Sequence, residues 1–154
     1  MYTTNTSAIN YPQIYLYRRI VQAKMFIDQH YAEEIDLNNI SNEAYFSKFH
    51  FLRLFKKIYQ KTPHQYLTTV RIEKAKLFLK DQMPVNEVCF AVGFSSIGSF
   101  TTLFKKLTGT TPSHYSESMK QLKSNITSAP LQYIPGCFAE MKGWNKKSNF
   151  EEVG

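Results

Sequence analysis

The chain carries one sequence pattern twice, and this repetition limits the fold more than any other feature. Residues 51–66 and 100–115 align at an offset of 49, and eight of the sixteen positions are identical. The identical pairs are Phe51/Phe100, Leu54/Leu103, Phe55/Phe104, Lys56/Lys105, Lys57/Lys106, Thr62/Thr111, Pro63/Pro112 and Tyr66/Tyr115. Further upstream, apolar positions match at an offset of 48. The repeat indicates one structural unit that is present twice.

Each copy centres on a short helix with one apolar face and one basic face. The inward positions of the first copy follow the i, i+3, i+4, i+7 spacing of a helix, at Phe51, Leu54, Phe55 and Ile58. The opposite face carries Phe49, Arg53, Lys56 and Gln60, with Leu52 at its flank. A shorter helix capped by Asp36 is expected before it, and Ser47 is expected to cap the basic helix. Two such helices form a helix-turn-helix.

Start and stop signals place the other helices. Thr62-Pro63 and Thr111-Pro112 combine a capping residue with a proline, which is a helix start. The helix from Pro63 is expected to reach Lys80, a length of about 27 Å. In the second copy Gly93 should end one helix in the left-handed conformation, and Ser95 or Ser96 should cap the next. The residues expected to be buried by that next helix are Phe100, Leu103, Phe104 and Leu107.

These elements predict an all-α fold of about seven helices, with two helix-turn-helix subdomains joined by a long connecting helix. The expected segments are a polar N-terminus (1–10), the first subdomain (11–61), the linker helix (62–80), the second subdomain (81–120) and a C-terminal tail (121–154). The tail contains prolines, glycines and four aromatic residues. We expect either a loosely ordered extension or a docking segment for a protein partner there.

Charge points to a polyanionic partner. The formal net charge is +7, and the segment from Ala44 to Ile72 has no acidic residue. Its six basic residues are Lys48, Arg53, Lys56, Lys57, Lys61 and Arg71. A local positive field of this kind suits a surface that meets phosphate groups.

Other classes of function lack their sequence signals. The two cysteines have no CxxC spacing and the four histidines are far apart, so no metal site, disulfide framework or cofactor is predicted. Cys89 is expected to be a small core residue. Catalytic pairs and glycine-rich phosphate loops are not visible, which disfavours an enzyme. With no apolar run near 20 residues and no secretion signal, we expect a cytoplasmic protein that does not enter membranes.

The linker helix suggests how two units would meet DNA. Successive major grooves on one face of DNA lie about 34 Å apart, so helices at either end of a linker of about 27 Å can enter neighbouring grooves. One copy of the chain is then sufficient to contact two neighbouring major grooves, and a dimer is not required. Because the units repeat in tandem, the predicted site is directional and not palindromic.

Four stretches resemble the DNA-binding domain of the AraC family of bacterial transcription regulators: SKFHFLRLFKK, RIEKAKLFL, VGFSSIGSFTTLFKKLTG and TPSHY. The resemblance covers residues 14–118 and implies two helix-turn-helix subdomains with seven helices. It also implies sequence-specific binding of double-stranded DNA and regulation of transcription, with activation through contact to RNA polymerase. The chain resembles the small stand-alone members typified by MarA and SoxS, whose activity is set mainly by the amount of protein; dependence on a protein partner is the alternative.

The resemblance implies specific DNA contacts. Those expected at base edges are Phe49, Leu52 and Arg53 in the first unit and Ile97, Gly98, Thr101 and Thr102 in the second. Those expected at phosphates are Lys48, Lys56, Lys57, Lys105 and Lys106. Arg53 matches the family pattern best and can pair bidentately with guanine, which contributes about 1–3 kcal/mol of discrimination.

The chain departs from the family pattern twice. Thr102 stands where the family commonly has arginine. The second unit is therefore expected to position the protein on the DNA more than to read the base sequence. Tyr45 replaces the usual turn glycine, and the first turn is therefore expected to be less regular than the second. An alternative function is a helix-turn-helix module that binds protein or RNA.

Overall fold

The computed structural model describes residues 11–135 and Met141, and this part of the chain is helical throughout. The α-helices are α1 (Tyr11–His30), α2 (Leu37–Glu43), α3 (Lys48–Tyr59), α4 (Pro63–Lys80), α5 (Val85–Ala91), α6 (Ile97–Thr108) and α7 (Pro112–Ser128). A short 3-10 helix, η1 (Pro130–Tyr133), follows. The predicted all-α fold with seven helices is confirmed for the described residues.

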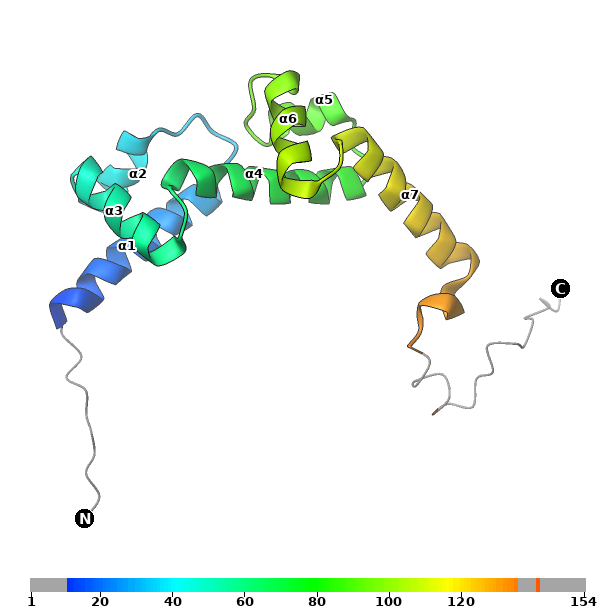
Figure 1. Ribbon diagram of the computed structural model, residues 1–154, viewed down its shortest axis with the longest axis horizontal. Helices are drawn as coiled ribbons and strands as arrows, with labels where there is room; N and C mark the ends of the chain where they lie inside the picture. Colours follow the sequence, from blue (N-terminus) through cyan, green and yellow to red (C-terminus); the bar gives the residue numbers. More distant parts are fainter. Residues whose placement is uncertain (1–10, 136–140, 142–154) are drawn as a thin grey trace, which may run out of the picture.

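Helix α4 runs through the middle of the molecule and carries one helix-turn-helix unit at each end (Figure 1). The first unit contains α2 and α3, and the second contains α5 and α6. α1 lies beside the first unit and α7 beside the second, and both project away from α4. The linker helix therefore has the predicted bounds, Pro63 to Lys80.

Each unit has its own hydrophobic core, and α4 contributes to both. The first core consists of Ile20, Ala23, Ile27, Ile40, Ala44, Phe51, Phe55 and Leu67. The second consists of Ile72, Ala75, Leu79, Val88, Cys89, Val92, Phe100 and Phe104. Burial of each phenylalanine contributes about 1.5–3 kcal/mol, so the duplicated Phe pairs account for much of either core. Leu67 lies in the first core and Ile72 in the second, which makes α4 the last helix of one unit and the first of the next.

Side-chain caps fix most of the helix starts. Asp36 accepts a hydrogen bond from the backbone N–H of Asn39 at 2.8 Å, and Thr62 accepts one from Gln65 at 3.2 Å. Ser96, and not Ser95, caps α6 by accepting from the N–H of Ser99. Ser47 occupies the N-cap position of α3 but its side chain makes no capping hydrogen bond. The expected capping position of Ser47 is therefore confirmed, but the expected hydrogen bond from its side chain is not formed.

The turns inside the two units have the same geometry, although one contains tyrosine and the other glycine. Tyr45 has φ 52° and Gly93 has φ 88°, both left-handed. In each turn the left-handed residue donates to the carbonyl three residues before it at 3.0 Å. The next residue donates to the carbonyl five before it, at 3.2 Å from Phe46 and 3.0 Å from Phe94. The expectation of a less regular first turn is wrong, because the Tyr45 side chain is 79% exposed and meets no steric obstacle.

Two features differ from expectation, the burial of Leu107 and the end of α7. Leu107 was expected to be buried but is 49% exposed. Its counterpart Ile58 is half-buried in a core that Tyr59 extends, whereas the counterpart of Tyr59 is Thr108, which is short and donates back to the Phe104 carbonyl at 2.8 Å. Helix α7 also continues past the expected subdomain end at residue 120 to Ser128, since no helix breaker precedes Pro130.

Candidate nucleic-acid interface

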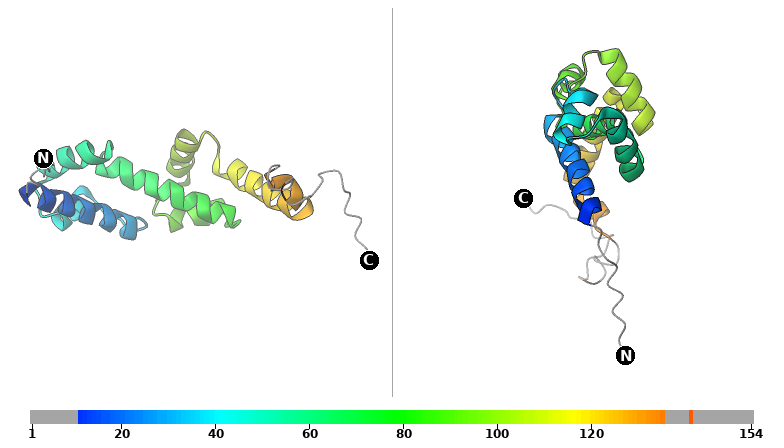
Figure 2. Two further views of the ribbon diagram at one scale, coloured as in Figure 1. Left: turned by 90° about the horizontal axis from the view of Figure 1, so that it is seen from below. Right: turned by 90° about the vertical axis from the view of Figure 1, so that its left-hand side faces the viewer.

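The two basic helices, α3 and α6, lie on the same side of the molecule. The right-hand view of Figure 2 shows both along one edge, with α1 on the opposite side. Both helices are held from behind by their phenylalanines, since Phe51, Phe55, Phe100 and Phe104 are all fully buried. The faces opposite these side chains are therefore presented to solvent together.

Helix α3 exposes most of the residues predicted to contact DNA. Phe49 is 83% exposed, and the side chains of Lys48, Arg53, Lys56 and Lys57 are exposed as well. Leu52 differs, because it is half-buried and lines a groove with residues of α2 and the start of α4. Leu52 thus stands at the flank of the exposed face.

Helix α6 presents the equivalent positions with smaller side chains. Ile97 is 45% exposed, and Gly98, Thr102, Lys105 and Lys106 are exposed. Thr101 is half-buried, like its counterpart Leu52. The structure therefore brings the predicted residues of each helix to one face, with the exception that Leu52 and Thr101 lie at its edge.

The cations of these faces are free of acidic partners. The ion pairs among the described residues are Lys24–Asp28 and Lys76–Glu73, and neither involves α3 or α6. Lys56 and Lys57 lie in the last turn of α3, as do Lys105 and Lys106 in α6, where positive charge also stabilises the helix end. Their charge remains available to an anionic ligand.

Arg71 belongs to the basic segment of the sequence but not to this surface. Its Nε donates to the Tyr31 carbonyl oxygen at 2.7 Å, and one terminal nitrogen donates to the Glu33 carbonyl at 2.8 Å. Burial lowers the pKa of the guanidinium from its ordinary value. Arg71 therefore does not belong with the exposed cations of α3 and α6, because it is half-buried and two of its donors bind carbonyls of the α1–α2 connection.

His50 and Arg19 adjoin the basic face of α3 and were not among the predicted contacts. His50 is exposed and lines a shallow hollow with Arg53, Leu54 and Lys57. Its ring stacks on Phe46 with 5.2 Å between centroids. The sequence did contain a signal for His50. It precedes Arg53 by three residues and Lys57 by seven, and this spacing places all three on the same side of a helix.

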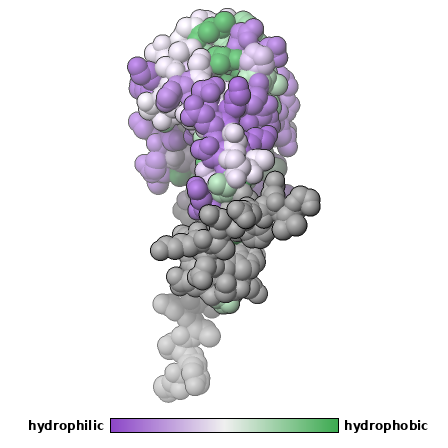
Figure 3. Space-filling model, turned by 90° about the vertical axis from the view of Figure 1, so that its right-hand side faces the viewer, coloured by the Kyte–Doolittle hydropathy of each residue, from purple (hydrophilic) through white to green (hydrophobic). Residues whose placement is uncertain are grey.

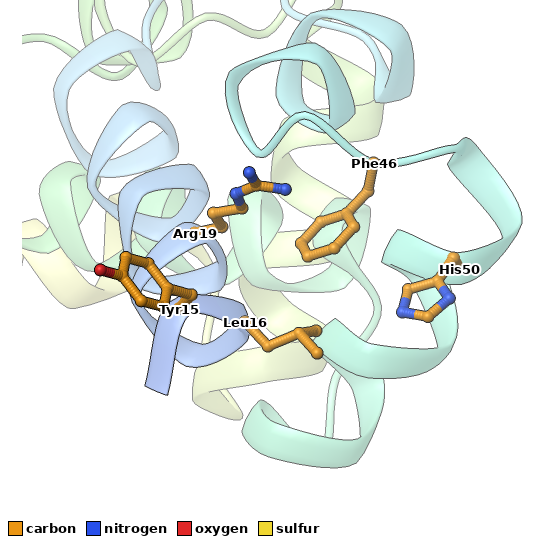
Figure 4. Close-up of a pocket in the computed structure, with 5 residues that line it drawn as sticks. All are labelled: Tyr15, Leu16, Arg19, Phe46 and His50. Carbon is orange, nitrogen blue, oxygen red and sulfur yellow. The ribbon is translucent and has the colours of Figure 1, made fainter. Parts of the chain in front are cut away.

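Arg19 reaches the same region from α1. Figure 4 shows Tyr15, Leu16 and Arg19 of α1 facing Phe46 and His50 across a hollow of about 320 Å³. The Arg19 guanidinium carbon lies 5.8 Å from the ring centroids of both Tyr45 and Phe46. No sequence signal could place Arg19 here, because the contact depends on how α1 packs against the α2–α3 turn.

Other groups with shifted pKa values belong to the scaffold. The Asp28 carboxylate and the Tyr66 hydroxyl raise the pKa of Lys24 above its ordinary value, and Tyr66 donates to Asp28 at 2.8 Å. Burial raises the pKa of the Cys89 thiol, in agreement with its position inside the second core. These groups tie helices together and do not line the exposed faces.

Among residues 11–135 and Met141, no three His, Cys, Asp or Glu side chains are grouped so that they could hold a metal ion. None of the helices in these residues combines the length and apolar character needed to cross a membrane.

The coloured part of the surface seen in Figure 3 is mostly hydrophilic, with a small hydrophobic area at its top.

Sequence comparison relates the chain to known regulators. A family described as a helix-turn-helix domain matches residues 40–118. The probable transcriptional regulator LumQ of Photobacterium leiognathi is 36% identical over 91 residues, which are 58% of this chain and 37% of LumQ. The probable transcription factor PqrA of Proteus vulgaris is 34% identical over 87 residues, which are 56% of this chain and 71% of PqrA. Against LumQ and two Bacillus subtilis regulators, the chain spans only 26 to 46% of the relative's length.

Structural comparison gives the same fold. An AraC-type DNA-binding regulator from Chromobacterium violaceum aligns with a TM-score of 0.64 at 21% identity, covering 68% of this chain and 95% of that one. The DNA-binding domain of the global transcriptional factor AdpA, solved in complex with a target DNA, aligns with a TM-score of 0.62 at 24% identity. That alignment covers 73% of this chain and 96% of the AdpA domain.

Proposed function

The chain belongs to the AraC family of helix-turn-helix proteins, and from this premise we propose that it binds DNA sequence-specifically and regulates transcription. The observation that carries the proposal is the pair of equivalent helices, α3 and α6, with exposed and unpaired basic residues on one side of the molecule. Each helix would enter a major groove, and the two grooves would be successive ones of a single duplex.

The two helices would contribute unequally. Arg53 reads guanine O6 and N7 in the groove of α3, with Phe49 and Leu52 in apolar contact beside it. In α6 the methyl groups of Ile97, Thr101 and Thr102 meet thymine methyls, and Gly98 lets the helix approach closely. The phosphate contacts would be Lys48, Lys56, Lys57, Lys105 and Lys106, which anchor the protein without reading sequence.

His50 and Arg19 extend this surface. His50 lies on the Lys57 side of Arg53, and Arg19 stands across the hollow from it. Both side chains would approach the DNA strand that borders the N-terminal half of α3. Their role is backbone contact, because neither is on the central line of the helix face.

One copy of the chain is sufficient for this mode of binding, since it carries two reading helices. We propose RNA polymerase as the protein partner, and activation as the sign of regulation. The proposed subdomains are residues 11–61 and 81–120, joined by residues 62–80. The tail from residue 121, whose first residues continue α7 to Ser128, is proposed as an extension that packs on the domain or docks a protein; its aromatic residues Phe138, Trp144 and Phe150 lie outside the described residues.

A selection from a random pool of DNA duplexes, followed by footprinting of the enriched sequence, tests the proposal. The expected site is directional, covers roughly 15–20 base pairs and shows protection in two successive major grooves. Competition with unrelated DNA, RNA of the same sequence and protein baits distinguishes the alternative, a helix-turn-helix that binds protein or RNA. Recovery of no enriched DNA motif would contradict specific DNA binding.

A further inference from the structure

Arg71 connects the two helix-turn-helix units from the middle of α4. Its Nε donates to the carbonyl oxygen of Tyr31 at 2.7 Å, and its terminal nitrogen donates to that of Glu33 at 2.8 Å. Both carbonyls belong to the α1–α2 connection of the first unit. The guanidinium carbon also lies 5.6 Å from the ring centroid of Phe94, in the α5–α6 turn of the second unit. One side chain therefore holds a loop of each unit.

Gly93 shows how closely these two loops approach each other. A Cβ atom added at Gly93 would lie 2.7 Å from the carbonyl oxygen of Ala32 and 3.0 Å from the Arg71 terminal nitrogen. Real Cβ atoms do not tolerate a backbone contact of that length, so any side chain here would push the loops apart. Tyr31, beside Ala32, packs against both hydrophobic cores. The α1–α2 connection and the α5–α6 turn thus form a direct contact between the units.

The same position in the first unit has no such contact. Tyr45 is equivalent to Gly93 but is 79% exposed, and its ring lies near Arg19 of the same unit. The left-handed turn alone consequently does not require glycine in this chain. At position 93 the requirement comes from the neighbouring unit.

We propose that Arg71 and Gly93 lock the two units into one rigid body and so set the spacing between the two half-sites that the protein accepts. This inference rests on the proposed DNA binding. Arg71 acts as a positioning residue, because its contacts with Tyr31, Glu33 and Phe94 all lie within the protein. Without the lock, only α4 and the packing of Tyr31 would join the units, and a helix with little support beside it bends and twists more readily than one held by a further contact.

DNA ligands of altered spacing provide the first test. The selected site is lengthened or shortened by one and by two base pairs between its half-sites, and affinities are measured for the full chain, Arg71→Ala and Arg71→Lys. The unaltered chain is expected to lose about tenfold or more in affinity for each altered site. Arg71→Ala should bind the original spacing more weakly and reduce the spacing penalty to about threefold or less, with Arg71→Lys between the two because it cannot span both carbonyls.

A matched pair of glycine substitutions separates the lock from backbone strain. Gly93 and Gly109 have similar left-handed φ values, 88° and 81°, but a Cβ at Gly109 would meet nothing within 4 Å. Both Gly93→Ala and Gly109→Ala should therefore lower the melting temperature through φ strain. Only Gly93→Ala should also relax the preference for one spacing.

A measurement without DNA tests the lock directly. Spin labels are attached through Glu43→Cys on α2 and Glu87→Cys on α5, both exposed positions, in a chain that also carries Cys137→Ser and keeps the buried Cys89. The distance distribution between the labels should be narrow in this background and in Gly109→Ala. It should broaden or shift in Arg71→Ala and Gly93→Ala.

The outcomes distinguish the two proposals. A chain that selects no DNA motif but shows the narrow distance and its loss in Arg71→Ala refutes the proposed function and supports the lock. A chain that binds its site while Arg71→Ala and Gly93→Ala keep both the full spacing penalty and the narrow distance refutes the lock alone.

Discussion

Arg53 and Thr102 occupy the same position, the sixth residue of α3 and of α6, and both side chains are exposed. Around them the duplicated scaffold is the same, with Phe51 and Phe55 matched by Phe100 and Phe104 in full burial. The units therefore differ at the centre of their outer faces and agree in their interiors. A guanidinium reaches a base edge and forms two hydrogen bonds there, whereas a threonine has one hydroxyl and a methyl group.

Arg53→Ala should relax base preference at one position in the first half-site. The expected cost is about 1–3 kcal/mol of discrimination against the wrong base, because the bidentate pair to guanine is lost. Selection and competition binding with all four bases at that position would measure it. Thr102→Ala is the matched control and should change discrimination far less. Equal effects of the two substitutions would contradict the assignment of α3 as the main reader.

Lys105→Ala should weaken binding to all sequences alike. Lys105 is exposed in the last turn of α6, beyond the positions that are proposed to face base edges, so its loss should remove one proposed phosphate contact. Titrations at several salt concentrations should show a slope lower by about one, with the order of preferred sequences unchanged. A change in sequence preference with an unchanged salt slope would show that Lys105 reads bases.

Phe51→Ala and Phe49→Ala should have opposite consequences, although the residues are two positions apart in α3. Phe51 is fully buried, so its truncation should lower the free energy of unfolding by about 3–5 kcal/mol. Phe49 is 83% exposed, and its truncation should leave stability nearly unchanged while weakening DNA binding. Denaturant unfolding and binding measured on the same samples would separate the effects. A large loss of stability in Phe49→Ala would place this side chain inside the fold.

Tyr45→Gly should be more stable than Tyr45→Ala. Both substitutions remove the ring beneath Arg19, but only glycine removes the cost of a left-handed conformation at φ 52°. The difference between the two variants should be about 1 kcal/mol, somewhat less if glycine's extra unfolded-state entropy offsets it. Thermal or urea unfolding gives the comparison. Equal stabilities would mean that the turn relaxes out of the left-handed region when the ring is absent.

Asp36→Asn should change how the stability of the protein depends on pH in the acidic range. The backbone N–H of Asn39 and the side-chain amide of Asn38 donate to the Asp36 carboxylate and hold its pKa below the ordinary value of 3.8. A lowered folded pKa contributes stability that is present above the unfolded value and is lost as pH falls through the folded value. Asparagine keeps a capping oxygen but does not ionise. The original chain should therefore be the more stable at neutral pH, and the two melting temperatures should converge as pH falls below 3.8 and through the lowered folded-state pKa of Asp36.

Much of the fold was predictable from local signals. The cap-and-proline pairs at Thr62-Pro63 and Thr111-Pro112 and the apolar spacing of α3 depend on residues within a turn or two of each other, and the structure has the helices there. The failures have non-local causes. Leu107 has the same helical spacing as its counterpart Ile58, but it is 49% exposed because the second core does not extend to it, whereas the first core includes Ile58 and Tyr59 among its partly buried neighbours.

The candidate surface shows the same division. Helical periodicity was sufficient to bring Phe49, Arg53, Lys56 and Lys57 to one face, because side-chain direction on a helix follows from its geometry. Counting charge along the stretch from Ala44 to Ile72 grouped Arg71 with these cations, although two of its donors go to carbonyls about forty residues away in the chain. Arg19 was missed for the same reason, since its neighbours Tyr45 and Phe46 come from another helix pair.

The amino-acid sequence alone determines the helices, the duplication, the caps and the outward faces of α3 and α6, because each of these follows from residues close together in the chain. Only the packed structure decides that Tyr45 can adopt a glycine conformation at the surface while Gly93 must remain glycine against Ala32. It also decides that Arg71 contacts the α1–α2 connection of one unit and the Phe94 ring of the other. The physical reason is that these outcomes depend on the space and the hydrogen-bond acceptors that distant segments supply once α1, α4 and the two turns have come together.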